Sequence, residues 1–319
     1  MNNLTRTLKI RYPIIQGGMG NISNSILAAA VSNAGGLGTI GAGTMNPEEI
    51  EKIILETKEL TKKPFAVNVA LSVSPYVKEI LGLAVKHSVA AVSLSAGNPA
   101  PFIHKLHEHG IKVITVVASV KQAIKAETAG ADVLVAEGYE AAGINSPNET
   151  TTLTLIPQIA RAVSVPVAAA GGIADGLGLA AMLVLGASAV QMGTRFIATQ
   201  EAPFHDSYKQ KILEASDTDT IIVGRSVGRI RRVINTPYAT KLLEAENQGI
   251  SLEAFNELTA EDNHKIGALL GDGENGFMNS GQISGYIQDL PTVSELLQKM
   301  MLDAEITLQK TTEIFKKER

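Results

Sequence analysis

Two glycine-rich segments in the middle of the sequence have the composition of an anion-binding site. Ala170-Gly171-Gly172 follows one short apolar run, and Gly193-Thr194 follows the next. Glycine lets backbone N–H groups approach a ligand closely, and N–H groups at the start of a helix attract phosphate. A single glycine pair more often closes a tight turn without any ligand. Two such pairs in succession favour a phosphate site, with the Thr194 hydroxyl as a further hydrogen-bonding group.

The other residues that follow apolar runs include few catalytic groups. Asn68, Glu137 and Glu140 occur there, but no lysine and no histidine, and the chain contains no cysteine. A Schiff-base enzyme needs a lysine amine, and a catalytic metal needs histidines beside carboxylates. We therefore predict no metal. A phosphate-bearing cofactor that supplies the chemistry itself fits these residues, and flavin mononucleotide (FMN) is the cofactor that we predict.

Eight short strands are expected to position these residues, because β-branched runs alternate with segments of helical spacing along the first two thirds of the chain. Strands separated by helices pair in parallel. Eight such units predict an α/β fold, a TIM (β/α)8 barrel, whose active site lies at the C-terminal ends of the strands. The expected strands are Pro13-Gln16, Leu37-Gly41, Phe65-Leu71, Ala90-Ser95, Lys112-Val117, Asp132-Glu137, Val165-Ala170 and Ala189-Gly193.

An open, doubly wound sheet is the alternative to the barrel, because it has the same alternation of strands and helices. Such a sheet carries a glycine-rich dinucleotide fingerprint after its first strand. The corresponding segment here, Gly17-Gly18-Met19-Gly20, does not have the spacing of that fingerprint. The similar lengths of the eight units and this missing fingerprint favour the barrel.

The chain is expected to divide into three parts. Residues 1–200 form the FMN-binding barrel. Residues 201–290 are more charged and mostly helical in pattern, with one strand signal at Thr220-Val223, and we expect them to form an insertion on the substrate side of the barrel. Residues 291–319 have the apolar spacing of a closing C-terminal helix, from Val293 to Lys317, that packs on the barrel.

The composition limits the partners that the protein can have. The chain has 28 basic and 32 acidic residues and a net charge of -4, which gives no general attraction to nucleic acid or to anionic membranes. No apolar run approaches the roughly 20 residues of a membrane-spanning helix. We expect a cytoplasmic enzyme with a small-molecule or acyl-chain substrate and no nucleic-acid or membrane partner. The sequence is compatible with a homodimer.

Six ordered blocks of sequence resemble one family of flavoproteins, that of nitronate monooxygenase and enoyl-ACP reductase II. The likeness continues through EAPFHDSYKQKIL to SGQISG at Ser280, and it implies an FMN-binding TIM barrel with an inserted helical substrate domain. The six blocks are YPIIQGGMG from Tyr12, AVSNAGGLGTIG from Ala30, PFAVNV from Pro64, VAEGYEAAG from Val135, VPVAAAGGIADG from Val165 and AVQMGTRF from Ala189.

The resemblance also implies which residues contact the flavin. Gly18, Met19 and Gly20 would support it from below, although Met19 is also ordinary core filler. For Asn68 and Gln282, capping of a turn is the alternative role. The full set of implied cofactor residues is Gly18, Met19, Gly20, Asn68, Glu137, Gly143, Ala170, Gly171, Gly172, Gln191, Met192, Gly193, Thr194 and Gln282.

One position departs from the family pattern. Members usually read EAxGH after the sixth strand, and the resemblance associates that histidine with catalysis, whereas this chain ends the same segment, 140–144, in Ile144. Isoleucine accepts no proton, so proton abstraction from a neutral nitroalkane would slow by about 10²- to 10⁴-fold. Hydride transfer from NAD(P)H and oxidation of a pre-formed nitronate need no such base.

Three residues are candidates to replace the missing histidine. Asn145 is the first, although a solvated turn is the favoured interpretation there. His205 stands with Glu201 and Lys209 at the spacing of one helical face, where an ion pair or a helix cap is the slightly favoured interpretation. His264 lies in the insertion and would reach the flavin only if the insertion folds over it.

Four arginines are clustered in the insertion, within eight residues of sequence. Their guanidinium groups suit the phosphate of NADPH or of a phosphopantetheine-linked substrate, but a solvated helix face is the favoured interpretation. The four are Arg225, Arg229, Arg231 and Arg232.

The favoured function is that of an FMN-dependent oxidoreductase. It would take hydride from NAD(P)H and reduce an unsaturated acyl chain, as enoyl-ACP reductase II does, or a quinone-type acceptor. The second hypothesis is a nitronate monooxygenase that oxidises alkyl nitronates with O2. The third is a non-redox phosphate-binding barrel or a weakly catalytic flavin binder.

Overall fold

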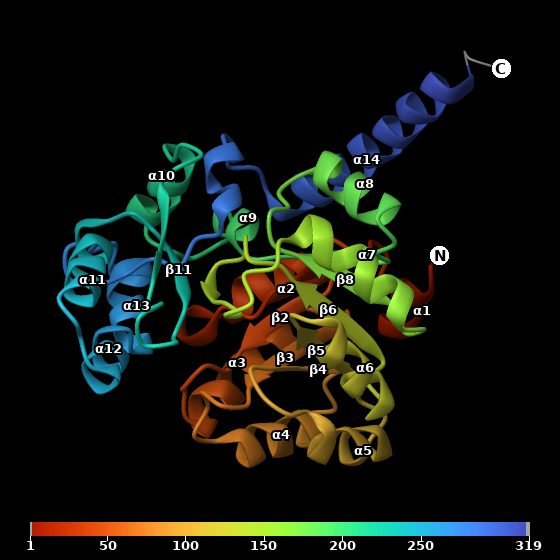
Figure 1. The fold of residues 1–319 in the computed structure, drawn as a ribbon. Coiled ribbons are helices and arrows are strands. Elements are labelled where there is room, and N and C mark those ends of the chain that lie inside the picture. The colour runs from red at the N-terminus through yellow and green to blue at the C-terminus, as the bar shows by residue number, and fades with distance from the viewer. Residues whose placement is uncertain (1, 317–319) are drawn as a thin grey trace.

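The computed structural model describes residues 2–316 and is built around eight parallel strands (Figure 1). Their order around the sheet is β1-β9-β8-β6-β5-β4-β3-β2. Leu37 beside β2 pairs in parallel with Ile15 of β1, and this contact closes the sheet. The predicted TIM barrel is therefore confirmed, and the open sheet is excluded. The strands are β1 (Ile14–Gln16), β2 (Gly38–Gly41), β3 (Phe65–Ala70), β4 (Ala91–Ser95), β5 (Lys112–Val117), β6 (Val133–Glu137), β8 (Val167–Ala170) and β9 (Ala189–Met192).

Helices surround this barrel and begin where the sequence supplies caps. Asn46 and Glu49 form a capping box at the start of α3, with hydrogen bonds of 2.9 and 3.1 Å, and Asp175 caps α8. Each cap satisfies backbone N–H groups that the first helical turn leaves unpaired. The barrel helices are α2 (Ser25–Asn33), α3 (Pro47–Leu60), α4 (Val77–Lys86), α5 (Ala100–Glu108), α6 (Val120–Thr128), α7 (Thr152–Ala162), α8 (Gly176–Val184) and the short α9 (Thr194–Ile197).

The inside of the barrel is filled by alternate strand residues. Successive side chains of a strand point to opposite faces, so every second residue enters the interior. Leu4 and Leu8 of α1 (Asn3–Leu8) pack into the same cluster and close the N-terminal end of the barrel. The strand residues of this buried cluster include Ile15, Ala66, Ala91, Ile114, Val133, Val135, Ala168, Ala170 and Ala189.

The same alternation places polar residues at the open end of the barrel. Asn68 lies two residues beyond Ala66, Glu137 two beyond Val135, and Gln191 two beyond Ala189. These polar residues therefore share the inward face with the apolar cluster below them.

The insertion combines helices with a small antiparallel sheet, which differs in part from the mostly helical pattern that we expected. The strand signal at Thr220–Val223 is strand β10, but a second strand, β11 (Arg231–Ile234), was not predicted because charged residues open it. β11 also pairs with β7 (Gly143–Ile144), which belongs to the barrel loop after β6. The helical elements of this region are α10 (Asp206–Leu213), α11 (Pro237–Asn247), α12 (Leu252–Leu258), α13 (Glu261–Leu270) and η2 (Gln282–Tyr286).

The last helix, α14 (Val293–Lys316), packs mainly against α8 and also contacts α2. Its second half extends away from the barrel (Figure 1). Lys317, the last residue of the expected helix, lies outside the described residues. Within residues 2–316, no helix is both long and apolar enough to cross a membrane.

Candidate active site

A cavity of about 1130 Å³ opens at the C-terminal ends of the barrel strands. Ligand sites typically measure about 300–1,000 Å³, so this cavity has room for a cofactor together with a second molecule. Barrel loops form one side, and residues of the insertion form the other. The predicted residues that line it are Gly18, Met19, Gly20, Asn68, Glu137, Gly143, Ile144, Asn145, Ala170, Gly171, Gly172, Gln191, Met192, Gly193, Thr194 and His264.

Two predicted residues are not part of the lining. Gln282 is exposed, and only its backbone N–H is engaged, donating to the Glu140 carbonyl over 2.9 Å. Its neighbours Gly281 and Ile283 do line the cavity. His205 caps α10 by accepting from Ser207 N, so the structure brings neither Gln282 nor His205 into the cavity wall.

Four residues at the ends of β8 and β9 form what we term the glycine cradle: Gly171, Gly172, Gly193 and Thr194. Gly171 and Gly172 have φ values of 102° and 73°, a left-handed conformation that other residues rarely adopt. Among the described residues, no acceptor takes a hydrogen bond from the backbone N–H groups of the cradle. A Cβ built on Gly193 would meet nothing within 4 Å. Free N–H groups beside open space suit an anion such as phosphate.

Two hydrogen-bonded connections hold the cradle in place. The Thr194 hydroxyl accepts from Gly281 N at 2.8 Å, which leaves its own hydrogen free for a ligand. The Thr152 hydroxyl lies 3.0 Å from the Gly171 carbonyl, and the Glu140 carboxylate accepts from the Thr152 N–H and hydroxyl, both at 2.9 Å. Glu140 therefore has a structural role in anchoring the loop between β6 and α7.

After β1, which pairs with β9, Gly18 approaches Asn68 closely. A Cβ on Gly18 would lie 2.7 Å from the Asn68 side chain, so only glycine fits there. The Asn68 amide nitrogen donates to oxygens of Ser93 and Ser95 at 3.2 Å, which holds the amide in one orientation. A flat backbone segment above a fixed amide is a suitable support for the ring system of a flavin, so the residues present fit this cofactor.

Glu137 is the acid at the end of β6, and burial raises its pKa to about 7. The charged carboxylate loses hydration there, and no hydrogen bond or charge among the described residues offsets this loss. Neutral Glu137 can donate a hydrogen bond to a ligand, which an ionised carboxylate cannot do.

This raised pKa predicts a pH-dependent stability of the flavin-free protein. A carboxyl group with a pKa near 7 when folded and 4.5 when unfolded destabilises the fold as pH rises from about 4.5 to 7. We expect Glu137→Gln to stabilise the protein at pH 8, by at most about 3 kcal/mol, and to have little effect at pH 4. Urea unfolding at the two pH values measures this difference. An equal effect at both values would contradict the raised pKa.

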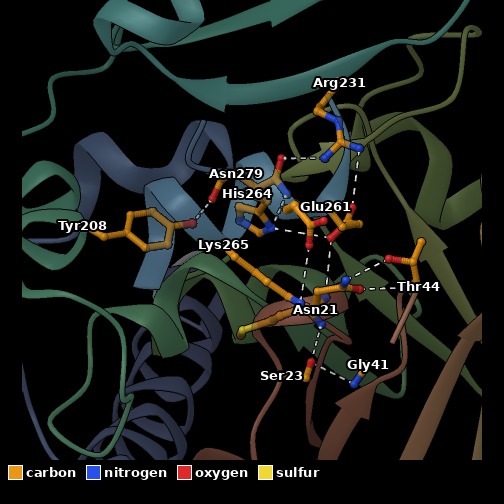
Figure 2. Close-up of polar contacts among 12 residues, drawn as sticks. Asn21, Ser23, Gly41, Thr44, Tyr208, Arg231, Glu261, His264, Lys265 and Asn279 are labelled. Carbon is orange, nitrogen blue, oxygen red and sulfur yellow. Dashed lines mark hydrogen bonds and ion pairs between the residues drawn. The ribbon is translucent and has the colours of Figure 1, made fainter. Parts of the chain in front are cut away.

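The insertion contributes a cluster of four polar residues to the cavity wall, which we term the buried cluster: Arg231, Glu261, His264 and Asn279 (Figure 2). Glu261 Oε1 lies 3.7 Å from Arg231 Nη2, and its Oε2 lies 3.8 Å from His264 Nδ1. Asn279 accepts from Arg231 over 3.3 Å. The rings of His264 and Phe277 stack with centroids 5.2 Å apart, and Arg231 lies over the same Phe277 ring.

Glu261 links this cluster to the barrel. Its Oε2 accepts from the backbone N–H of Asn21, which follows the Gly18-Met19-Gly20 segment, at 3.5 Å. Burial by itself would raise the pKa of Glu261, but His264, Arg231 and the Asn21 N–H together lower it to about 2. The sequence analysis did not identify Glu261 or Asn279, because no spacing pattern connects them to Arg231.

Two of the favoured interpretations were wrong. Asn145 is not in a solvated turn: it is buried and donates to the carbonyls of Ala141 and Gly143. Arg231 and Arg232 are not on a solvated helix face but lie buried in β11, where acceptors satisfy their charge. For His205 the favoured structural role agrees with its position as the cap of α10, although Glu201 does not share its helical face, because α10 begins only at Asp206 and Glu201 instead accepts from the N–H of Val293.

A closed parallel (β/α)8 barrel with a cavity at the C-terminal ends of its strands belongs to the class of TIM-barrel enzymes. A family model described as nitronate monooxygenase matches residues 1–303. The chain belongs to this family, as the sequence resemblance predicted, and it is an FMN-dependent oxidoreductase.

Individual relatives match over nearly the whole chain. The structure of FabK from Thermotoga maritima is 41% identical and has a TM-score of 0.94, covering 98% of this chain and 99% of that one. A nitroalkane oxidase from Streptomyces ansochromogenes is 25% identical with a TM-score of 0.85, covering 97% and 100%. A 5-hydroxy-7a-methyl-1-oxo-octahydro-indene-4-carboxyl-CoA dehydrogenase from Rhodococcus jostii is 33% identical, covering 94% and 95%.

Proposed function

We propose that this protein uses NAD(P)H and FMN to reduce the carbon–carbon double bond of an unsaturated acyl thioester. The observation that carries the proposal is a single cavity with a glycine cradle at one side and room for a second molecule beside the cofactor. Similarity to FabK, the enoyl-ACP reductase II, and to a carboxyl-CoA dehydrogenase supports a thioester substrate. Residues 1–200 would bind the cofactor, and residues 201–290 would cover the substrate.

The residues of the chain have separate tasks in this reaction. The cradle would bind the terminal phosphate of FMN through its free N–H groups and the Thr194 hydroxyl. Gly18 and Asn68 would orient the ring, and neutral Glu137 would donate a hydrogen bond to it. When bound, FMN supplies the chemistry of accepting a hydride from NAD(P)H and passing it to an acceptor.

Oxidation of neutral nitroalkanes is less well supported by the same cavity. Ile144 lines the cavity and is 49% exposed, so an aliphatic side chain faces solvent where the family pattern has a histidine. It cannot remove a proton from a neutral nitroalkane. A double-bond reductase has no need of a base at this position.

Anaerobic stopped-flow measurements test the proposed function. We expect NADH or NADPH to bleach the flavin absorbance, and crotonyl-CoA to restore it within the same experiment. Oxygen uptake with a pre-formed alkyl nitronate, compared with free FMN, tests the second hypothesis in parallel. Failure of both nicotinamides to bleach the flavin would exclude the proposal.

A further inference from the structure

The buried cluster contains a hydrogen-bond donor that the protein itself leaves unused. His264 is 2% exposed, and its Nε2 has no hydrogen-bond partner among the described residues. Burying a polar nitrogen without a partner is unfavourable by about 1–3 kcal/mol. His264 also belongs to the lining of the cavity, but Nε2 itself is inaccessible to solvent, so a ligand bound there supplies the missing acceptor only after neighbouring side chains shift.

The neighbours of His264 determine which ring nitrogen carries the hydrogen. Arginine only donates, so the contact from Arg231 Nη1 requires the Asn279 oxygen to face Arg231. The Asn279 NH₂ group then faces His264 Nδ1, at 3.4 Å, and Nδ1 accepts. A neutral imidazole whose Nδ1 accepts carries its hydrogen on Nε2, and an imidazolium carries hydrogens on both nitrogens. Nε2 is a donor in both of these states, whereas a neutral ring with its hydrogen on Nδ1, toward Glu261 Oε2 at 3.8 Å, would leave Nε2 as an acceptor.

The charged and titratable groups around His264 come from several elements. Glu261 lies on the same helix, Arg231 comes from β11, and the Tyr208 hydroxyl of α10 donates to the Asn279 carbonyl (Figure 2). Ile144, the cross-strand partner of Arg231, adds no polar group. Among the described residues that line the cavity, His264 is the sole histidine.

We propose that His264 Nε2 donates a hydrogen bond to the carbonyl oxygen of the acyl thioester, with Asn279 and Arg231 as positioning residues that fix the imidazole. This proposal rests on the proposed function and assigns the carbonyl-binding group within it. The carbonyl oxygen of the ligand would supply the acceptor that Nε2 lacks.

Such a donor assists addition of hydride to the double bond. A hydride bonds to Cβ, the π electrons of the Cα=Cβ bond shift to form a Cα=C bond, and the carbonyl π electrons move onto oxygen. A solvent proton then bonds to Cα as the C=O bond re-forms. NAD(P)H is oxidised to NAD(P)⁺, and the acyl chain gains one hydride and one proton. The Nε2–H group stabilises the negative charge that develops on the oxygen, as an oxyanion-binding donor does.

The test compares flavin-loaded variants in two separate steps, reduction of the flavin by NAD(P)H and its reoxidation by crotonyl-CoA. His264→Phe keeps the ring stacked on Phe277 but removes the donor, whereas His264→Gln keeps a donor near the Nε2 position. We expect reoxidation by crotonyl-CoA to slow about 100-fold in the first variant and less in the second, with flavin reduction by NAD(P)H within about twofold of wild type. His205→Asn, which removes the other insertion imidazole but keeps a helix cap, is the matched control.

An infrared measurement provides a second readout that does not depend on turnover. Hexanoyl-CoA has no double bond to reduce, so it can be bound with ¹³C at its carbonyl without reacting. Because a hydrogen bond weakens the C=O bond, its C=O stretching frequency should be lower in wild type and in His205→Asn than in His264→Phe. An unchanged stretch together with unchanged reoxidation in His264→Phe would overturn the proposal. If that variant does not hold flavin, His264→Asn replaces it, since its amide reaches only the Nδ1 position. Wild type that crotonyl-CoA fails to reoxidise would instead refute the proposed function, while the stretch would still report on the hydrogen bond.

Discussion

A Gly193→Asp variant is expected to fold normally and to purify without its flavin. Gly193 has a φ of -116°, which any residue adopts, and a Cβ there meets nothing within 4 Å. The new carboxylate would stand beside the free N–H groups where we place the FMN phosphate. Two unit charges about 5 Å apart repel by about 3 kcal/mol at an effective dielectric constant near 20, which is roughly 100-fold in affinity.

Gly193→Asn is the matched control, because asparagine has nearly the same size and no charge. Fluorescence titration of FMN into each flavin-free protein gives the dissociation constants. We expect the FMN affinity of the asparagine variant to fall by less than about tenfold, since the asparagine and aspartate side chains differ mainly in charge. Equal affinities in the two variants would show that no anionic group occupies the glycine cradle.

Arg231→Met is expected to destabilise the protein by about 3–5 kcal/mol at pH 7, because it removes one partner of a buried ion pair. Arg231 and Glu261 have side chains that are 8% and 12% exposed. Methionine keeps most of the side-chain length and can still contact Phe277, so the principal loss is the charge beside Glu261. The double variant Arg231→Met/Glu261→Gln should recover much of the lost stability.

The pH dependence of this effect follows from Glu261. Its pKa is about 2 in the folded protein and 4.5 ordinarily, so its stabilising contribution is present above pH 4.5 and is lost as pH falls toward 2. The difference between wild type and Arg231→Met should therefore narrow between pH 7 and pH 3. Urea unfolding of the three proteins measures it. Identical unfolding midpoints for wild type and Arg231→Met at pH 7 would show that the ion pair contributes nothing.

The barrel and the glycine cradle could be predicted because their signals are local. Each strand is a short β-branched run, and each glycine of the cradle directly follows such a run. The inward positions of Asn68, Glu137 and Gln191 follow from the two-residue period of a strand once its apolar residues are known. These features need no knowledge of how distant segments pack.

The buried cluster could not be predicted, because its members meet only through tertiary packing. Arg231 lies in β11, Glu261 in α13 and Asn279 in the segment before η2, and no period relates their positions. Strand β11 was missed for a related reason. Arg232 lies buried there because the Tyr139 carbonyl and the Thr220 hydroxyl accept from its guanidinium, and a sequence pattern treats such a residue as solvated.

The three-stranded sheet limits which segments of this enzyme can be exchanged with those of another barrel. Two of its strands, β10 and β11, belong to the insertion, whereas β7 belongs to a barrel loop far earlier in the chain. Transfer of residues 201–290 to another barrel would therefore carry an incomplete sheet with an unpaired edge. A functional chimera must therefore exchange the loop of residues 138–151 together with the insertion. The two segments have to be transferred as a pair, although about 50 residues of barrel separate them in the sequence.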